Sequence, residues 1–236
     1  MRKRAFTLVE LLVVIGIVAL LISILLPVLS SARQAGQRVK CLSNLRSMQV
    51  AQALYVAENR GYLVHSGFGH GGAHTDAEIA WFNVLQRYGS NKLLPRCPGD
   101  DSPHWPENGT VVPNSSGRFR MTSYGVNNYL DPAVCPSGGP YTKITQIRRS
   151  SSTIQFLEMT RFGDFAGADH PHVESWVGNV PAAAAKHLQI DAHGGPVKSW
   201  ESRANYGFVD GHAETLRFGE VYRSIVTNKF DPAVAQ

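Results

Sequence analysis

The chain has few cysteines and none of the short motifs that mark common enzymes. Its 236 residues include three cysteines, Cys41, Cys97 and Cys135, spread over 95 positions without a CxxC pair. That spacing excludes a zinc-ribbon type of site. Walker loops, HExxH helices and nucleophile elbows are absent as well, and we therefore expect no enzyme. Paired carboxylates of a hydrolase leave no sequence spacing, so a hydrolase remains the open alternative.

A strong excess of positive charge is also missing. The net charge is +5, from 23 basic and 18 acidic residues, but three of the bases are Arg2, Lys3 and Arg4. Without these three, 20 bases face 18 acids and the net charge falls to +2. A basic patch of the kind that binds nucleic acid is not expected from this balance, and neither is a nucleic-acid partner.

Charge is almost absent between Phe6 and Leu29, where one acid, Glu10, stands among Leu, Ile and Val. As a helix this run is about 36 Å long, enough to span a hydrocarbon core of about 30 Å. The bases before it keep the N-terminus in the cytoplasm under the positive-inside rule. We expect a leader at residues 1–5 and a single transmembrane helix at residues 6–29.

Three interpretations compete for this apolar run. The first is a plain membrane anchor. The second is a cleaved secretory signal, for which Ser30 to Ala32 make a poor cleavage site and the apolar core is too long. The third starts from Glu10, because a carboxylate in a bilayer costs several kcal/mol unless it has a partner. The run contains no Lys or Arg, so that partner is sought in another chain or in a group created by processing.

The opening letters RKRAFTLVELLVV resemble the type III signal of type IV prepilins and type II secretion pseudopilins. The resemblance implies that prepilin peptidase cuts between Ala5 and Phe6, and that Phe6 is then N-methylated. The family usually has Gly where this chain has Ala5. Its glutamate, matched here by Glu10, pairs with the terminal amine of a neighbouring subunit during filament assembly. Pro27 stands where many pilins carry a helix-bending proline.

Helical spacing continues beyond the apolar run. Apolar residues recur every three or four positions at Val39, Leu42, Leu45, Met48, Ala51, Leu54 and Tyr55. Such a stripe is typical of a helix with one buried face. We expect residues 30–61 to continue the helix outside the membrane, to pack their stripe on a domain, and to end at Gly61 as a C-cap.

Residues 62–236 are long enough for one globular domain with its own core. Their pattern predicts a short helix from Glu78 to Tyr88, and strands within residues 118–130, 153–160 and 204–218. Asp210 and Gly211 stand between two β-prone runs and suggest a type I′ hairpin turn. The expected fold is α+β and pilin-like: a long N-terminal helix packed on a small antiparallel β-sheet with large loops.

Several segments resemble a bacterial family that joins a prepilin N-terminus to a C-terminal H-X9-DG domain. They are KCLSNLRSM, RCPGD, SYGVN, KITQIRRSSSTIQFLE and ANYGFVDGHAE. The spacing of this motif differs from the family pattern, because sixteen residues separate His193 from Asp210 where the family has nine. The resemblance implies a disulfide between Cys41 and Cys97 that ties the helix to the domain. Cys97 with Cys135 is the alternative in an oxidising compartment.

The sequence favours no bound cofactor, with calcium as the alternative. Secretion pseudopilins often bind calcium, and this resemblance implies a site built from Asp191, Asp210 and loop carbonyls. Calcium prefers such oxygen ligands, although the spacing is not that of an EF-hand. We expect Asp210 and Gly211 to form a turn first and a ligand site only second.

The resemblance implies a structural subunit of a type II secretion or type IV pilus-like filament. It would lie in the bacterial inner membrane with its C-terminal domain periplasmic or in a filament. The implied partners are prepilin peptidase, other pilin or pseudopilin subunits and inner-membrane lipid. The alternative is a membrane-anchored extracytoplasmic binding module or hydrolase that only borrows the prepilin signal. Glu10 separates the two, because a plain anchor gains nothing from it.

Overall fold

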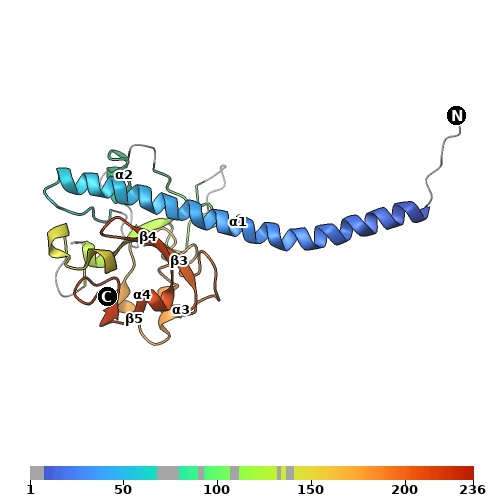
Figure 1. Ribbon diagram of the computed structural model, residues 1–236. Coiled ribbons are helices and arrows are strands. Elements are labelled where there is room, and N and C mark those ends of the chain that lie inside the picture. Colours follow the sequence, from blue (N-terminus) through green and yellow to red (C-terminus); the bar gives the residue numbers. More distant parts are fainter. Residues whose placement is uncertain (1–7, 68–79, 90–92, 107–111, 132–133, 137–140) are drawn as a thin grey trace.

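The computed structural model describes residues 8–67, 80–89, 93–106, 112–131, 134–136 and 141–236. Its longest element is helix α1, which runs for 51 residues over Leu8–Glu58. Figure 1 shows α1 as one curved helix whose second half lies against the domain while its first half projects away. The long apolar run and the amphipathic stretch after it therefore form a single helix.

Two residues with left-handed backbone follow the end of helix α1. Arg60 has φ 56° and Gly61 has φ 84°. The N–H of Gly61 donates to the carbonyl of Val56 at 2.9 Å, which is the long bond of a Schellman cap. Arg60 occupies the position after the cap where glycine is most common, and Gly61 follows it. The helix thus stops at Glu58, slightly before the expected end at Gly61.

Four strands form the main sheet, in the order β1-β2-β3-β4, and all neighbours are antiparallel. The strands are β1 Tyr124–Val126, β2 Ile154–Glu158, β3 Arg203–Phe208 and β4 Ala213–Arg217. Tyr124 lies opposite Glu158, and the pairing of β2 with β3 shifts between Ile154 and Phe156. This sheet confirms the predicted α+β arrangement of a long helix on a small antiparallel sheet.

The sheet is buried on both faces. One apolar cluster lies between α1 and the sheet, and it includes Leu45 and Met48 from the helix and Phe156 from β2. A second cluster covers the opposite face, where Tyr206 and Phe208 of β3 are buried. Figure 1 shows α1 on one side of the sheet, with α3 and α4 on the other. Alternation along the strands divides their side chains between these two cores.

Short elements complete the domain. They are α2 Trp81–Gln86, α3 Val180–Ala184, α4 Phe218–Val221, the strand pair β5 Tyr222–Ser224 and β6 Thr227–Asn228, and four 3₁₀ turns at Asn128–Leu130, Ile144–Gln146, Ser150–Ser152 and Val173–Ser175. Helix α2 is shorter than the predicted helix, whose first residue lies outside the described part of the chain. Long connections between strands match the large loops that the sequence predicts.

The strand predicted within residues 118–130 is confined to β1. Before β1 the backbone bonds to loops instead of a neighbouring strand: Arg120 N–H donates to His104 O at 2.8 Å, and Ser123 N–H donates to Pro95 O at 2.7 Å. After β1 the chain enters the 3₁₀ turn at Asn128–Leu130. Local β-propensity was right here, but the available partners limited the strand to three residues.

The turn between β3 and β4 differs from the expected type I′ turn. Gly211 has φ 100°, whereas Asp210 is not among the residues with positive φ. Gly211 N–H donates to Phe208 O, and Phe208 N–H donates to His212 O, both at 2.9 Å. The connection is therefore a three-residue loop that ends in a left-handed glycine. Only one of the two predicted residues needs the conformation that glycine provides.

Replacing Gly211 by Val should lower the free energy of unfolding by roughly 1–3 kcal/mol. A Cβ at this position would meet no atom within 4 Å, so the cost comes from the left-handed backbone alone. Denaturant titration of the purified chain in detergent measures the change. Asp210→Asn is the matched control and should be nearly neutral; equal losses for both variants would contradict this account of the turn.

His187 is a buried histidine beside the second core. Its Nδ1 accepts the backbone N–H of His172 at 2.9 Å, and its ring stacks on Phe165 with centroids 4.0 Å apart. Burial, helped by the nearby charge of His172, lowers the pKa of His187 from 6.5 to about 4. The folded protein therefore keeps this ring neutral at pH values where the unfolded chain binds a proton.

Stability should consequently fall as the pH drops from about 6.5 to about 4, and His187 should contribute up to about 3 kcal/mol of that loss. Above pH 6.5 its contribution is fully present, because both states are neutral there. Comparing the unfolding free energy of wild type and His187→Gln across this pH range isolates the contribution of His187. Parallel pH curves for the two proteins would show that His187 is not responsible.

Candidate functional site

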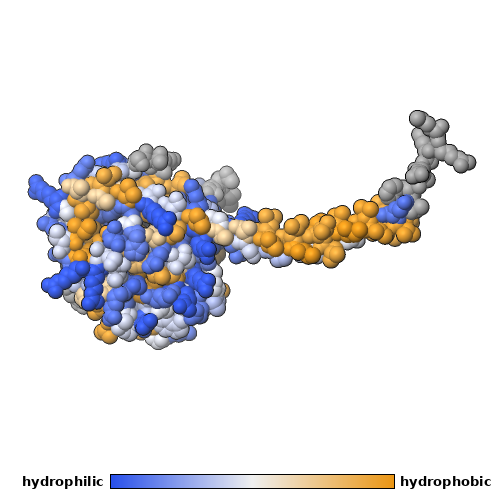
Figure 2. Space-filling model, viewed as in Figure 1, coloured by the Kyte–Doolittle hydropathy of each residue, from blue (hydrophilic) through white to orange (hydrophobic). Residues whose placement is uncertain are grey.

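The first half of α1 exposes apolar side chains on every side. Between Leu8 and Leu29 the large hydrophobic residues are 47–73% exposed. Among the described residues, α1 is the one helix long and apolar enough to cross a membrane; its most apolar 18-residue window has a mean hydropathy of 3.1 and no buried residue. Figure 2 shows this half as a nearly continuous apolar surface. A surface of this extent requires lipid or other protein around it.

Glu10 lies on this surface near the start of α1, and Pro27 lies inside the helix. Proline has no N–H to donate to the carbonyl four residues earlier, which here belongs to Ser23. Two serines bond back to the helix in this region: Ser23 Oγ to Leu20 O at 2.7 Å, and Ser31 Oγ to Pro27 O at 3.0 Å. Such features favour bending, and Figure 1 shows the helix curved. Ala5 and Phe6 lie outside the described residues.

The second half of α1 packs on the domain, but through a face that is rotated from the predicted stripe. Leu45, Met48 and Ala51 are buried as predicted, whereas Val39 and Leu54 are 62% and 48% exposed. Steps of three residues slip by about 60° each on a helix of 3.6 residues per turn, so the ends of the predicted stripe leave the buried face. Polar residues occupy three further buried positions: Asn44, Gln49 and Gln52.

Polar side chains fasten this face to the domain. Asn44 Nδ2 donates to the hydroxyl of Tyr124 in β1 at 3.0 Å. Asn205 Nδ2 of β3 donates to the carbonyl of Arg38 at 3.1 Å, and Gln37 Nε2 donates to Pro98 O at 3.1 Å. These bonds fix the rotation of α1 about its own axis, because each requires one particular face of the helix to meet the sheet or the Cys97 loop.

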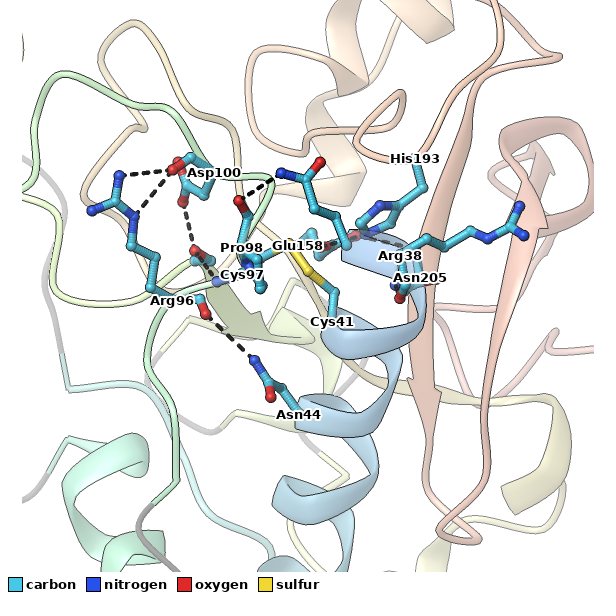
Figure 3. Close-up of a disulfide and its surroundings, with 12 residues drawn as sticks. Arg38, Cys41, Asn44, Arg96, Cys97, Pro98, Asp100, Glu158, His193 and Asn205 are labelled. Carbon is cyan, nitrogen blue, oxygen red and sulfur yellow. Dashed lines mark hydrogen bonds and ion pairs between the residues drawn. A yellow bond between two sulfur atoms is a disulfide. The ribbon is translucent and has the colours of Figure 1, made fainter. Parts of the chain in front are cut away.

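Cys41 and Cys97 form a disulfide between α1 and the loop that precedes β1 (Figure 3). Their Cα atoms are 5.1 Å apart, and 56 positions separate them in the sequence. Both residues are almost fully buried. Cys135 is a free, half-buried cysteine. The disulfide lies at the place where the helix leaves the domain, so it ties the projecting half of α1 to the globular part.

A buried ion pair supports the loop that carries Cys97. Arg120 Nε contacts Asp100 Oδ2 at 2.6 Å, and the two side chains are 1% and 2% exposed. Ser123 Oγ donates to the same carboxylate oxygen at 2.5 Å. Burial alone would raise the pKa of Asp100, but Arg120 and the hydrogen bonds outweigh it and lower the pKa below its usual range. Asp100 is therefore charged and held in one position.

Glu158 and His193 meet next to the disulfide. His193 Nε2 lies 3.0 Å from Glu158 Oε1, and both side chains are almost fully buried. The other carboxylate oxygen of Glu158 accepts the backbone N–H of Asn205 at 3.1 Å. Sequence reasoning singled out His193 but missed its partner. The one available hint was a glutamate that ends an otherwise apolar strand, β2.

The predicted turn and metal residues lie apart from one another. Asp191 and His193 precede β3, where His193 N–H donates to Arg203 O at 2.9 Å. Asp210 follows the other end of β3 and accepts the backbone N–H of His212. A six-residue strand is roughly 20 Å long, so one ion cannot bind both Asp191 and Asp210. A calcium ion at either carboxylate alone stays a prediction.

Comparison with known families matches residues 1–26 to the prokaryotic N-terminal methylation motif. No curated protein and no solved structure matches the chain. The motif and the exposed apolar helix that begins within it support a type IV pilin-like protein anchored in a membrane. Proteins with this motif are typically structural subunits rather than enzymes.

Proposed function

We propose that the chain is a pilin-like or pseudopilin structural subunit of a type II secretion or type IV pilus-like filament. Prepilin peptidase removes residues 1–5 by cutting between Ala5 and Phe6, Phe6 is N-methylated, and the subunits assemble through α1. One observation carries the proposal: the methylation motif at residues 1–26 contains the start of helix α1, whose first half exposes apolar side chains all round.

Before assembly, residues 6–29 span the inner membrane, with the N-terminus in the cytoplasm and the domain outside it. The bases at positions 2 to 4 favour this orientation. In the filament the same apolar surface packs against α1 of other subunits, and Glu10 pairs with the amine of a neighbouring Phe6. This charge pair gives the intramembrane carboxylate a purpose that a plain anchor lacks.

The proposal also assigns residues 30–61 to the extracytoplasmic part of the helix and residues 62–236 to an H-X9-DG-type domain. In this assignment His193 and Asp210 are the His and Asp of the motif, and the segment before β3 carries an insertion. The pair between His193 and Glu158 supports a structural role for the histidine, since it holds the segment before β3 against the end of β2.

The mature protein should begin at N-methylated Phe6. The reason is the run of basic residues at positions 2 to 4 within the matched motif. The measurement is the intact and N-terminal peptide mass of the chain purified from membranes. In a strain without prepilin peptidase the chain should keep residues 1–5. Ala5→Gly, which restores the family's usual residue, should be processed at least as fast. An intact Met1 despite the peptidase, or a start near Gln34, would refute the proposal.

A further inference from the structure

Four side chains with metal-binding atoms meet where α1 crosses the sheet. Cys41 comes from α1, Cys97 from the loop before β1, Glu158 from the end of β2 and His193 from the segment before β3 (Figure 3). Their two sulfurs, one carboxylate oxygen and one imidazole nitrogen all lie within 4.8 Å of one another. In the described part of the chain, this is the one group of three or more such ligands.

We propose that the dithiol form of the protein binds one Zn²⁺ ion through these four side chains. Thiolate, imidazole and carboxylate are the ligands that zinc takes in tetrahedral sites. Zinc–ligand bonds of about 2.0–2.3 Å place tetrahedral ligand atoms about 3.3–3.8 Å apart, which fits within the observed 4.8 Å limit. Side-chain rotation of Cys41 and Cys97 separates the sulfurs, and their Cα atoms, 5.1 Å apart, stay where they are.

The surroundings orient the ligands as they do in established zinc sites. Glu158 Oε2 is held by the backbone N–H of Asn205, whose side-chain oxygen accepts from Thr215 Oγ1 at 2.7 Å. The backbone of His193 is fixed by its bond to Arg203 O. Partners of this kind maintain ligand orientation and raise metal affinity. All four ligating side chains are buried, which is typical of a closed, structural zinc site.

A small cavity beside the cluster offers room near the ligands. Cys97 and Glu158 line it together with Arg161, Gln189 and others, and its volume is about 10 Å³. That is about the space of one water molecule. The core is therefore not completely filled on the side of the cluster that Cys97 and Glu158 form.

The disulfide form and the zinc-bound form exclude each other, because both use the sulfurs of Cys41 and Cys97. A dithiol reductant transfers two electrons and two protons to the Cys41–Cys97 disulfide, becomes a disulfide itself and leaves two thiols. Zinc binding then releases the two thiol protons, because thiolates are the ligands. In the disulfide form His193 Nε2 faces Glu158 Oε1 at 3.0 Å and carries the proton between them. On binding zinc, Nε2 gives up this proton and Nδ1 takes one from solvent, so the ring binds as a neutral ligand with no net change in its protons. Oxidation reverses the sequence and expels the ion, while α1 stays tied to the domain in either state.

The test uses the full chain in detergent micelles with Cys135→Ser, which removes the third thiol. The protein is reduced with a phosphine, titrated with Co²⁺ as a spectroscopic probe, and then titrated with Zn²⁺. We expect one cobalt ion per chain, a thiolate-to-cobalt charge-transfer band, the strong visible bands of tetrahedral cobalt, and displacement by one Zn²⁺. The disulfide form should show none of these bands, and oxidising the zinc form should release the ion to a chromogenic chelator.

Glu158→Gln and His193→Gln should each weaken zinc binding by about tenfold or more without changing the number of titratable thiols. His212→Gln is the matched control, since His212 is an exposed histidine on the β3–β4 hairpin, and it should bind as wild type. Equal binding by the His193 variant, tetrahedral bands in the disulfide form, or no 1:1 binding by the reduced protein would overturn the proposal.

If the reduced apoprotein unfolds, circular dichroism provides the test. Recovery of the native spectrum with Zn²⁺ in the reduced protein, and not in its His193→Gln form, supports the site, because binding then supplies folding free energy. A reduced chain that stays unfolded with Zn²⁺ present would overturn it.

Discussion

A chain with Glu10→Leu should insert into the membrane normally and yet fail to enter filaments. Insertion becomes easier, since the change removes a group that costs up to about 3 kcal/mol inside a bilayer. In the proposed filament, the variant lacks the charge-assisted bond to the amine of Phe6 in the neighbouring subunit. Such a bond is worth about 1.5–3 kcal/mol, so incorporation should fall by about tenfold to a hundredfold.

The measurement compares membrane-inserted and filament-bound chain when the variant is co-expressed with its partner subunits. Glu10→Gln keeps the size of the side chain and should fail as well, whereas Glu10→Asp keeps the charge and should assemble in part. Leu11→Ala, next along the same exposed surface, controls for loss of apolar contact. Wild-type incorporation of Glu10→Gln would show that the charge has no docking role.

Arg120→Met should lower the free energy of unfolding by about 3–5 kcal/mol, because it leaves the carboxylate of Asp100 buried without its counter-charge. Arg120 also donates to the carbonyl of Met159 at 3.0 Å and to that of Thr160. Its guanidinium lies 5.9 Å from the ring of Trp105. Denaturant unfolding of the full chain in detergent, followed by tryptophan fluorescence, measures the loss.

The double variant Asp100→Asn with Arg120→Met distinguishes a stranded charge from lost packing. If the stranded carboxylate causes the instability, removing its charge should restore a large part of the lost stability. Asp101→Asn is the control from the adjacent position, since Asp101 is 76% exposed in its contact with Arg161, and it should change stability little. A double variant as unstable as Arg120→Met alone would contradict the ion-pair explanation.

Helices and strands that are specified by residues close together in the sequence were predicted well. The helix over Leu8–Glu58 follows from an apolar run joined to helical periodicity. Strands β2 and β4 lie within the predicted segments, and β3 begins one residue before its segment. The turn at Gly211 was expected at the right place but with the wrong geometry, since the positive φ falls on Gly211 alone. Loop length depends on how two strands are paired, which sequence spacing does not specify.

The buried face of α1 was predicted only in part. Leu45 and Met48 are core residues, but Asn44 and Gln49 are buried beside them, and Val39 is exposed. Hydrophobicity alone cannot place a buried amide, because its burial depends on a partner elsewhere, as with Asn44 and the hydroxyl of Tyr124. The pairs of Asp100 with Arg120 and of Glu158 with His193 are hidden in the sequence for the same reason.

By itself, the sequence determined the membrane-length helix, the basic residues at positions 2 to 4 that favour its orientation, and the position of Glu10 within it. These properties depend on neighbours along the chain, whose spacing a helix preserves. Only the tertiary structure decided which side of α1 meets the sheet and which four side chains gather around Cys41. Residues from position 41 to position 193 come together there, and contacts over such separations are set by the packing of a whole domain, which no local pattern encodes.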